Sequence, residues 1–114
     1  MKKLLTICAI TVSLCAAQAA LAGGSAAAGK EKAKVCAACH GANGISTSDQ
    51  FPILAGQYPD YIVQALHEYK DGQRKNPIMA GMAKPLSNQD IQDLAAYFSS
   101  LPGPLHMLPR KGSY

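Results

Sequence analysis

The run Cys36-Ala37-Ala38-Cys39-His40 constrains this chain more than any other feature of its sequence. A pair of cysteines separated by two residues and followed directly by histidine is the pattern at which a c-type haem is attached. Two thiols on one short turn can each add across a vinyl group of the haem, and the next imidazole can bind the iron as the proximal ligand. The pattern therefore predicts one haem c bound covalently by Cys36 and Cys39, with His40 as an iron ligand.

A C-x-x-C pair has two other common uses, and the sequence lacks the context for both. A thioredoxin-like redox pair follows a strand in a βαβ pattern, and a structural zinc site needs a second Cys/His pair at finger or ribbon spacing. Neither pattern is present, and the sequence contains no second C-x-x-C-H. One haem is therefore the expected cofactor.

The first 22 residues have the three parts of a secretory signal peptide. The chain begins with Met1-Lys2-Lys3, continues through an apolar stretch over 4–17, and reaches an A-x-A-like cleavage site at Ala20-Leu21-Ala22. The apolar stretch is shorter than the roughly 20 residues that span a bilayer. We therefore expect the segment 1–22 to be removed, and the mature protein, beginning at Gly23, to be periplasmic without a membrane span.

Removal of the signal peptide changes both the cysteine count and the charge. Cys8 and Cys15 leave with it, so Cys36 and Cys39 are the cysteines that remain. The whole chain has 11 Lys and Arg against 7 Asp and Glu, and the loss of two lysines leaves a net charge of +2. Because no basic stripe with interleaved aromatic residues is present, nucleic acid is not an expected partner.

Apolar periodicity predicts an all-α fold with three main helices. The helices are expected at about 27–38, 59–70 and 87–101, with Pro59 at the first position of the second. A capping-box-like sequence at Ser87 starts the third. We assign 23–101 to one domain and 102–114, which is rich in Pro and Gly, to a poorly ordered tail.

Two long stretches without helical periodicity remain inside this small domain, 41–58 and 72–86, and we expect them to be irregular and to cover the two faces of a haem. Gly29 lies inside the first helix, where it costs about 1 kcal/mol relative to alanine. Close packing of another helix at Gly29 would explain that cost.

The sixth iron ligand decides between electron transfer and ligand chemistry. Met79 and Met82 both lie in the stretch 72–86, and a His/Met ligand pair raises the reduction potential, as suits a carrier. Methionine more commonly fills gaps in packing, so one of the two is expected to ligate and the other to pack. His67, on the second helix, and His106, in the tail, are not expected to bind the iron.

These features together resemble the class I c-type cytochromes, specifically the small periplasmic cytochromes of the c-553 type and the single halves of two-domain, two-haem cytochromes. The matching positions cover most of the mature chain: Gly29, Cys36-Ala37-Ala38-Cys39-His40-Gly41, Phe51-Pro52-Ile53-Leu54-Ala55-Gly56-Gln57, Met79, Leu86-Ser87 and Leu94-Ala95-Ala96-Tyr97-Phe98. The resemblance implies a class I cytochrome c fold around a single haem.

The resemblance also implies roles for single residues. In such cytochromes the ligand methionine lies eight residues before the serine of a Leu-Ser pair, which here selects Met79 and leaves Met82 as the fallback. The carbonyl of Pro52 would accept a hydrogen bond from the proximal imidazole, although Pro52 could equally be only a turn former.

The resemblance also suggests roles in helix packing and in contact with the haem propionates. Gly29 would let Tyr97 or Phe98 approach the first helix. Arg74 and Lys75 are candidates to meet a haem propionate, and an ordinary solvated surface position is an equally good interpretation of both.

The resulting functional prediction is a periplasmic, monomeric, one-electron carrier that meets redox proteins transiently and converts no substrate itself. Two alternatives stay open. The chain could be the haem c subunit of a dehydrogenase or flavocytochrome complex, which co-purification with a second polypeptide would reveal. It could also be a ligand-binding or peroxidase-like haem protein, which needs an open sixth position.

Overall fold

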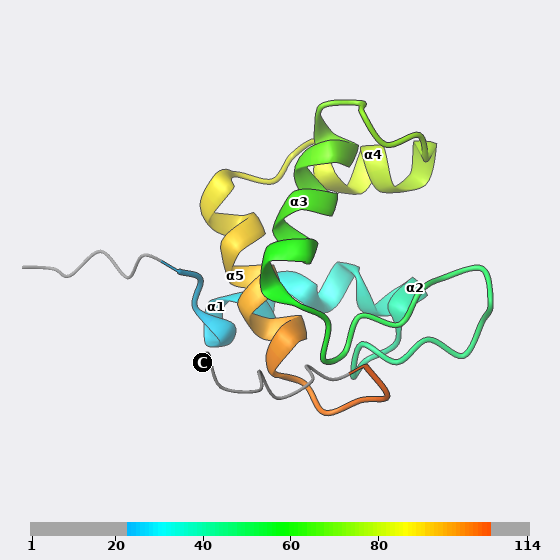
Figure 1. Cartoon of the computed structure of the whole chain (residues 1–114), viewed down its shortest axis with the longest axis vertical. Coiled ribbons are helices and arrows are strands. Elements are labelled where there is room, and N and C mark those ends of the chain that lie inside the picture. The colour runs from blue at the N-terminus through cyan, green and yellow to red at the C-terminus, as the bar shows by residue number, and fades with distance from the viewer. Residues whose placement is uncertain (1–22, 106–114) are drawn as a thin grey trace, which may run out of the picture.

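The computed structural model describes residues 23–105; the predicted signal peptide, His106 and the rest of the predicted tail lie outside them. Within that range the chain forms helices and no strand, so the predicted all-α class is confirmed. Its α-helices are α1 (Ala26–Lys32), α2 (Ala37–His40), α3 (Pro59–Lys70), α4 (Pro77–Ala83) and α5 (Asn88–Ser100), and a 3₁₀ turn (Ala33–Val35) joins the first two. Figure 1 shows α3 and α5 in the middle of the molecule, with α4 at one end of α3.

The first and last helices cross in close contact, as Figure 1 shows. Gly29 of α1 is buried at the crossing, where a Cβ atom would lie 2.0 Å from the carbonyl oxygen of Asp93 and 2.7 Å from Cβ of Tyr97. No side chain fits there, which confirms that Gly29 allows a close helix approach. The neighbouring aromatic residue is Tyr97, one of the two that the resemblance named.

A buried carboxylate fixes the same crossing. Asp93 is 3% exposed, and its oxygens accept hydrogen bonds from Nζ of Lys32 (2.7 Å), the backbone N–H of Ser25 (2.8 Å) and Nε2 of Gln89 (2.9 Å). The bond from Lys32, followed by that from Ser25, lowers the pKa of Asp93 to about 2. Three donors satisfy this charge, so it joins α1 to α5 without an uncompensated burial cost.

The hydrophobic core lies where α3 packs on α5. Pro59 is the first residue of α3, and Ser87 and Asp90 form the capping box that starts α5, so the second and third predicted helices are confirmed. The buried residues of the core cluster are Ala33, Ile62, Leu94, Ala95 and Phe98.

The prediction that 72–86 is irregular throughout was wrong, because α4 occupies its middle. Oδ1 of Asn76 accepts hydrogen bonds from the backbone N–H groups of Ile78 (3.0 Å) and Met79 (3.1 Å), and Pro77 takes the first helical position. An N-cap asparagine followed by proline is a helix start, so the signal was present in the sequence. The predicted first helix is likewise divided by the 3₁₀ turn, whereas 41–58 is irregular as expected.

Part of the predicted tail is packed against the domain. Gly103 lies so close to Ala55 that a Cβ atom on the glycine would be 2.7 Å from Cβ of Ala55. The carbonyl oxygen of Leu105 approaches Gly56 even more closely, at 1.8 Å from the position of a Cβ atom. Gly103 and Leu105, which lie beyond the predicted boundary at 101, therefore pack against the domain.

Candidate haem-binding site

The two cysteines and the histidine of the motif share one helical turn. Cys36 precedes α2, and the backbone N–H groups of Cys39 and His40 donate to its carbonyl oxygen at 3.2 and 2.9 Å. Both thiols are free and half-buried, and burial raises the pKa of Cys36, which favours the protonated thiol. This short turn therefore presents two thiols and one imidazole together.

The imidazole of His40 is buried and held from one side. It is 5% exposed, and its Nδ1 donates a hydrogen bond of 2.8 Å to the carbonyl oxygen of Pro52. The structure thus contains the contact that the resemblance implied. Because Nδ1 carries the proton in this bond, Nε2 is left as the nitrogen able to bind a metal ion.

The residues that follow Pro52 are fixed by main-chain hydrogen bonds to Gly44 and to α5. Leu54 and Ala55 donate their backbone N–H groups to the carbonyl oxygen of Gly44, at 2.8 and 3.0 Å. Gly56 donates to the carbonyl oxygen of Phe98 on α5 at 3.0 Å. An irregular loop is thereby tied to the last helix, which keeps the Pro52 carbonyl in place against His40.

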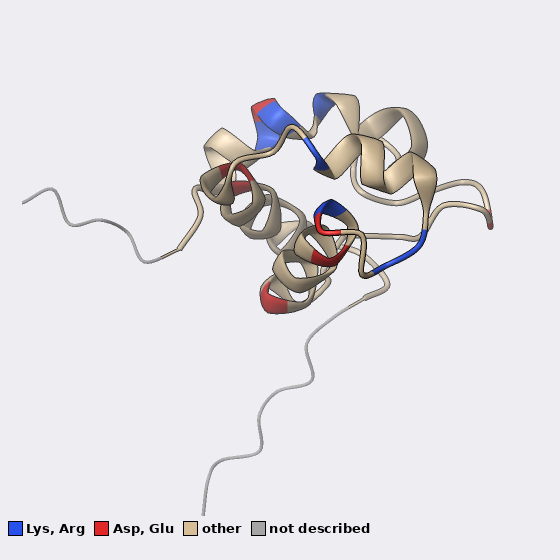
Figure 2. Cartoon of the chain, turned by 90° about the horizontal axis from the view of Figure 1, so that it is seen from above, with Lys and Arg blue, Asp and Glu red and all other residues tan. Residues whose placement is uncertain are grey.

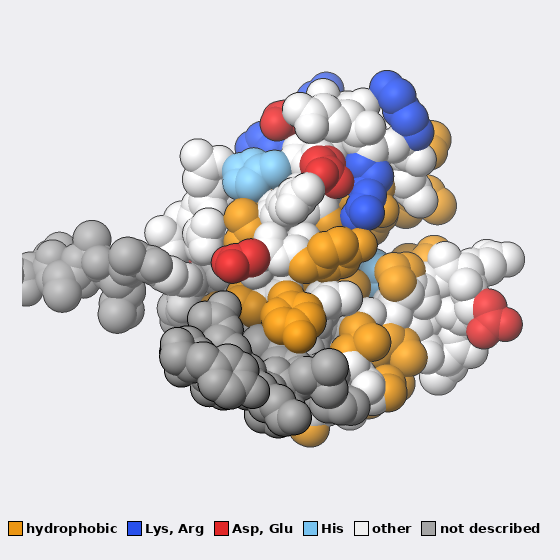
Figure 3. Space-filling model, viewed as in Figure 1, with side chains coloured by type: hydrophobic (Ala, Val, Ile, Leu, Met, Phe, Trp, Pro, Cys, Tyr) orange, Lys and Arg blue, Asp and Glu red, His pale blue; other side chains and the backbone are white. Residues whose placement is uncertain are grey.

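The two candidate methionines lie on α4, which packs on α3. Met79 is half-buried, whereas Met82 is 47% exposed. Figure 3 shows hydrophobic side chains gathered across the middle of one face, between the part that carries α4 and the loop that follows α2. Large hydrophobic residues are exposed in both parts and in the helices between them: Val35, Ile45, Tyr58, Tyr61, Ile78 and Met82.

The donor set fits a covalent haem. Two free thiols could form the thioether bonds, the free nitrogen of His40 could bind iron on one side, and a methionine sulfur could bind it on the other. Residues 23–105 hold no group of three or more His, Cys, Asp and Glu side chains placed to bind a metal ion. The donors present thus match haem attachment.

The remaining candidates have partners within the protein. The guanidinium of Arg74 lies over the rings of Tyr61 and Tyr69 and beside the carboxylate of Glu68. Nζ of Lys75 donates to the carbonyl oxygen of Gly72 at 2.9 Å. His67 is half-buried on α3.

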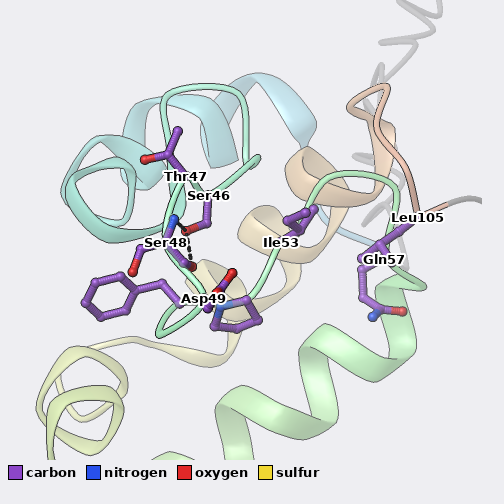
Figure 4. A pocket seen from close by; sticks show the side chains of 9 residues that line it. Ser46, Thr47, Ser48, Asp49, Ile53, Gln57 and Leu105 are labelled. Carbon is purple, nitrogen blue, oxygen red and sulfur yellow. Dashed lines mark hydrogen bonds between the residues drawn. The ribbon is translucent and has the colours of Figure 1, made fainter.

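A separate pocket of about 500 Å³ opens beside the loop 46–57. In Figure 4 Ser46, Thr47, Ser48 and Asp49 lie on one side of it, and Ile53, Gln57 and Leu105 lie on the other. Phe51 and Pro52 complete the lining, which includes none of the haem-motif residues and neither methionine of α4. The pocket therefore contains none of the proposed donors but adjoins one of them, because Phe51 and Pro52 also contact His40.

Residues 26–102 match the cytochrome c family. The chain belongs to this family. Its membership implies a covalently bound haem c, and the single C-x-x-C-H of the sequence accounts for one such group. The predicted resemblance to class I c-type cytochromes is confirmed.

Individual relatives agree with this assignment. Cytochrome c4 of Pseudomonas aeruginosa is 48% identical over 100 residues, which cover 88% of this chain and 49% of that protein. Cytochrome c-554(548) of Halomonas halodenitrificans is 45% identical over 68% of this chain and 96% of its own length. A "Thiosulfate dehydrogenase electron acceptor" of Thiomonas intermedia is 43% identical over 66% of this chain and 35% of its own length.

The fold comparison gives the same result. The crystal structure of reduced cytochrome c4 from Pseudomonas stutzeri superposes with a TM-score of 0.67 at 46% identity, over 70% of this chain and 47% of that one. The predicted class I cytochrome fold is thereby confirmed. The chain spans about half the length of the cytochrome c4 relatives it matches. None of the helices within 23–105 is long and apolar enough to cross a membrane.

Proposed function

We propose that the mature protein is a periplasmic one-electron carrier, with one haem attached to Cys36 and Cys39 and its iron bound by His40 and Met79. The observation that carries this proposal is the buried imidazole of His40, whose Nδ1 is bonded to the Pro52 carbonyl at 2.8 Å beside two free thiols. The haem supplies the Fe(II)/Fe(III) couple, and the protein tunes that couple through its ligands and surroundings.

The Pro52 carbonyl has a role in this scheme through His40. A hydrogen bond to Nδ1 fixes the tautomer and the ring plane of a ligand histidine and makes its other nitrogen more basic. Because the main-chain contacts to Gly44 and Phe98 hold the loop, the carbonyl cannot easily leave the ring. His40 is thereby kept in a single orientation in both oxidation states.

Met79 is favoured over Met82 as the second axial ligand. Its side chain is the more buried of the two, and its backbone N–H is held by the Asn76 side chain. A thioether ligand stabilises Fe(II) and leaves no open position for small molecules. This ligation therefore supports a carrier over the peroxidase-like alternative.

The sequence supports the proposed periplasmic location. The residues at 1–22 have the organisation of a cleaved signal peptide, and haem attachment would use both cysteines of the exported chain. A carrier must release its partner after each transfer, so we expect small, transient contacts, below about 1,200 Å² of buried surface.

A second candidate function is that of a haem c subunit dedicated to one dehydrogenase. It is favoured by the relative from Thiomonas intermedia that is named as the electron acceptor of a thiosulfate dehydrogenase. The two functions use the same haem site and differ in the lifetime of the complex. A dedicated subunit would stay bound through purification, whereas a free carrier would not.

Replacement of each methionine in turn tests the ligand assignment. Met79→Ala should lower the reduction potential and allow carbon monoxide to bind the reduced protein, because the iron loses its sulfur ligand. Met82→Ala, three residues further along α4, should leave both properties nearly unchanged and serves as the matched control. Redox titration and a carbon monoxide difference spectrum measure the two effects.

The opposite result would move the ligand to Met82. If neither variant changed the potential or the carbon monoxide spectrum, a methionine of α4 would not be the ligand and the proposed carrier site would be wrong.

A further inference from the structure

Arg74 is tied to α3 through five contacts. Its backbone N–H donates to the carbonyl oxygen of Glu68 at 3.0 Å, and its Nε lies 3.6 Å from Oε2 of the same residue. Its Nη2 donates to the hydroxyl of Tyr61 at 3.2 Å. The guanidinium carbon also lies 5.7 Å from the ring centre of Tyr61 and 5.3 Å from that of Tyr69.

This pattern uses what distinguishes arginine from lysine. A planar guanidinium can stack on aromatic rings while its edge donates hydrogen bonds in fixed directions. Here the two tyrosine rings are contacted by the cation, and the edge is directed to a hydroxyl and a carboxylate. An ion pair at this exposure would contribute little alone, so the stacking and the directed bonds account for most of the attachment.

The attachment lies at the start of the segment that carries Met79. Asn76, two residues after Arg74, accepts the backbone N–H of Met79 on its side-chain oxygen at 3.1 Å. At the other end of the segment, Nζ of Lys70 on α3 donates to the carbonyl oxygen of Leu86. Figure 1 shows α4 lying at the end of α3, and the two helices are in contact. The segment 74–86 is therefore fastened to α3 at both ends.

We propose that Arg74 is a positioning residue for the axial methionine: it clamps the start of the segment 74–86 onto α3 and so keeps the Met79 sulfur at the iron. This inference rests on the His40/Met79 ligation proposed above. It gives Arg74 a role through the protein itself, distinct from contact with a haem propionate.

The frequency with which the methionine leaves the iron is the quantity to measure. In a His/Met haem protein the rate of carbon monoxide binding to the reduced form reports on it, as does the sulfur-to-iron charge-transfer band of the oxidised form. Arg74→Ala should raise the carbon monoxide rate about fivefold, the ratio that corresponds to one cation–π contact at a surface site, and weaken the band. Lys30→Ala, which removes an exposed cation from α1, is the control and should change neither.

Tyr61→Phe separates the clamp from a propionate contact. If the clamp exists, Tyr61→Phe should raise the carbon monoxide binding rate, as Arg74→Ala does. The double variant should then raise the rate by less than the two single effects combined. A propionate contact would leave Tyr61→Phe without effect, and that result would overturn the inference. Arg74→Lys should restore part of the band, because lysine keeps the charge but cannot stack and donate in two directions at once.

These variants also distinguish failure of the inference from failure of the proposed function. If Met79→Ala opens the iron but Arg74→Ala and Tyr61→Phe do not change the rate, the ligand assignment holds and the clamp is wrong. If Met79→Ala has no effect, the proposed site itself is wrong. Should Arg74→Ala not accumulate as a haem protein, Tyr61→Phe and Arg74→Lys provide the same test with smaller changes.

Discussion

The α1–α5 crossing and the segments that carry the proposed axial ligands, His40 and Met79, are held together in different ways. At the crossing, backbone meets backbone at Gly29, and the buried carboxylate of Asp93 collects donors from both helices. The ligand side consists of an irregular loop and a short helix. The bond from His40 to Pro52 holds the loop, and the contacts of Arg74 with Glu68 and two tyrosine rings hold the helix segment. The two regions are therefore stabilised by different kinds of contact.

We therefore expect the crossing to determine the stability of the fold, and the ligand side to determine the geometry of the proposed iron ligands. Changes at the crossing should alter the free energy of unfolding and leave the haem spectrum of the folded protein unchanged. Changes on the ligand side should alter the spectrum or the potential at little cost in stability. Figure 2 shows charges of both signs distributed over the molecule, and residues 23–105 carry seven Lys and Arg against seven Asp and Glu.

The largest expected effect is that of Gly29→Val. The new side chain would enter the space of the Asp93 main chain, so the helices would have to separate, at a cost of about 3 kcal/mol or more. Chemical denaturation of the holoprotein, followed by far-ultraviolet circular dichroism, measures it. The fraction that remains folded should keep the wild-type haem spectrum.

Gly81→Ala is the control for Gly29→Val. Gly81 lies in α4, and a Cβ atom there would have no atom of another element within 4 Å, so alanine should be tolerated and should stabilise by about 0.5–1 kcal/mol through helix propensity. Equal loss of stability in the two variants would contradict the special role of the crossing.

Asp93→Asn should have the next largest effect, about 2 kcal/mol at neutral pH, because the charged bonds to Lys32 and Ser25 are lost. The pKa of Asp93 falls from 3.8 to about 2 on folding. Its contribution is therefore complete above pH 4 and is lost as the pH falls toward 2. Thermal unfolding of both proteins between these pH values measures it.

The difference in stability between wild type and Asp93→Asn should thus shrink toward acid pH, with the spectrum unchanged throughout. Asp71→Asn, at an exposed position after α3, should show no such convergence. If the difference in stability instead grew toward low pH, the charged form of Asp93 would not be the form that stabilises the fold.

The smallest effect is expected from Lys84→Glu, on the ligand side. Lys84 is exposed at the end of α4. We expect a redox partner to approach the haem edge, near the turn 36–40 and the segment that carries Met79. Charge reversal should change the association rate by a few-fold at low salt, and the effect should fade as the Debye length falls from about 30 Å at 0.01 M to about 8 Å at 0.15 M. Stopped-flow electron transfer measures it, with Lys30→Glu on α1 as the control.

A long-lived complex whose electron transfer ignores both salt and Lys84 would favour the dedicated-subunit function over the free carrier. Dependence on Lys30 equal to that on Lys84 would place the docking surface elsewhere.

Local signals in the sequence predicted most of the fold. The spacing of apolar residues and the capping residues Pro59 and Ser87 located α3 and α5, because these determinants lie within the helices themselves. The start of α4 at Asn76-Pro77 was an equally local signal that the expectation of an irregular haem-covering loop obscured. The haem motif was legible because its five residues are consecutive.

Long-range partnerships could not be predicted in the same way. Asp93 is a charged residue within an apolar stripe, and its burial becomes intelligible only once Ser25 and Lys32, more than 60 positions away, are beside it. The environment of Arg74 depends on Tyr61, 13 residues earlier, and resembled an ordinary surface position. The packing of Gly103 on Ala55 likewise has no local signature.

The contact between Ser25 and Asp93 also bears on the order in which the chain can fold. It joins residues 68 positions apart, so the crossing cannot form until nearly the whole domain has left the export channel. Its formation must also overcome the entropy of closing a long loop. Cys36 and Cys39 lie early in that interval. In a chain exported from its N-terminus, both thiols would emerge well before α5, while the polypeptide around them is still open to the machinery that attaches the haem.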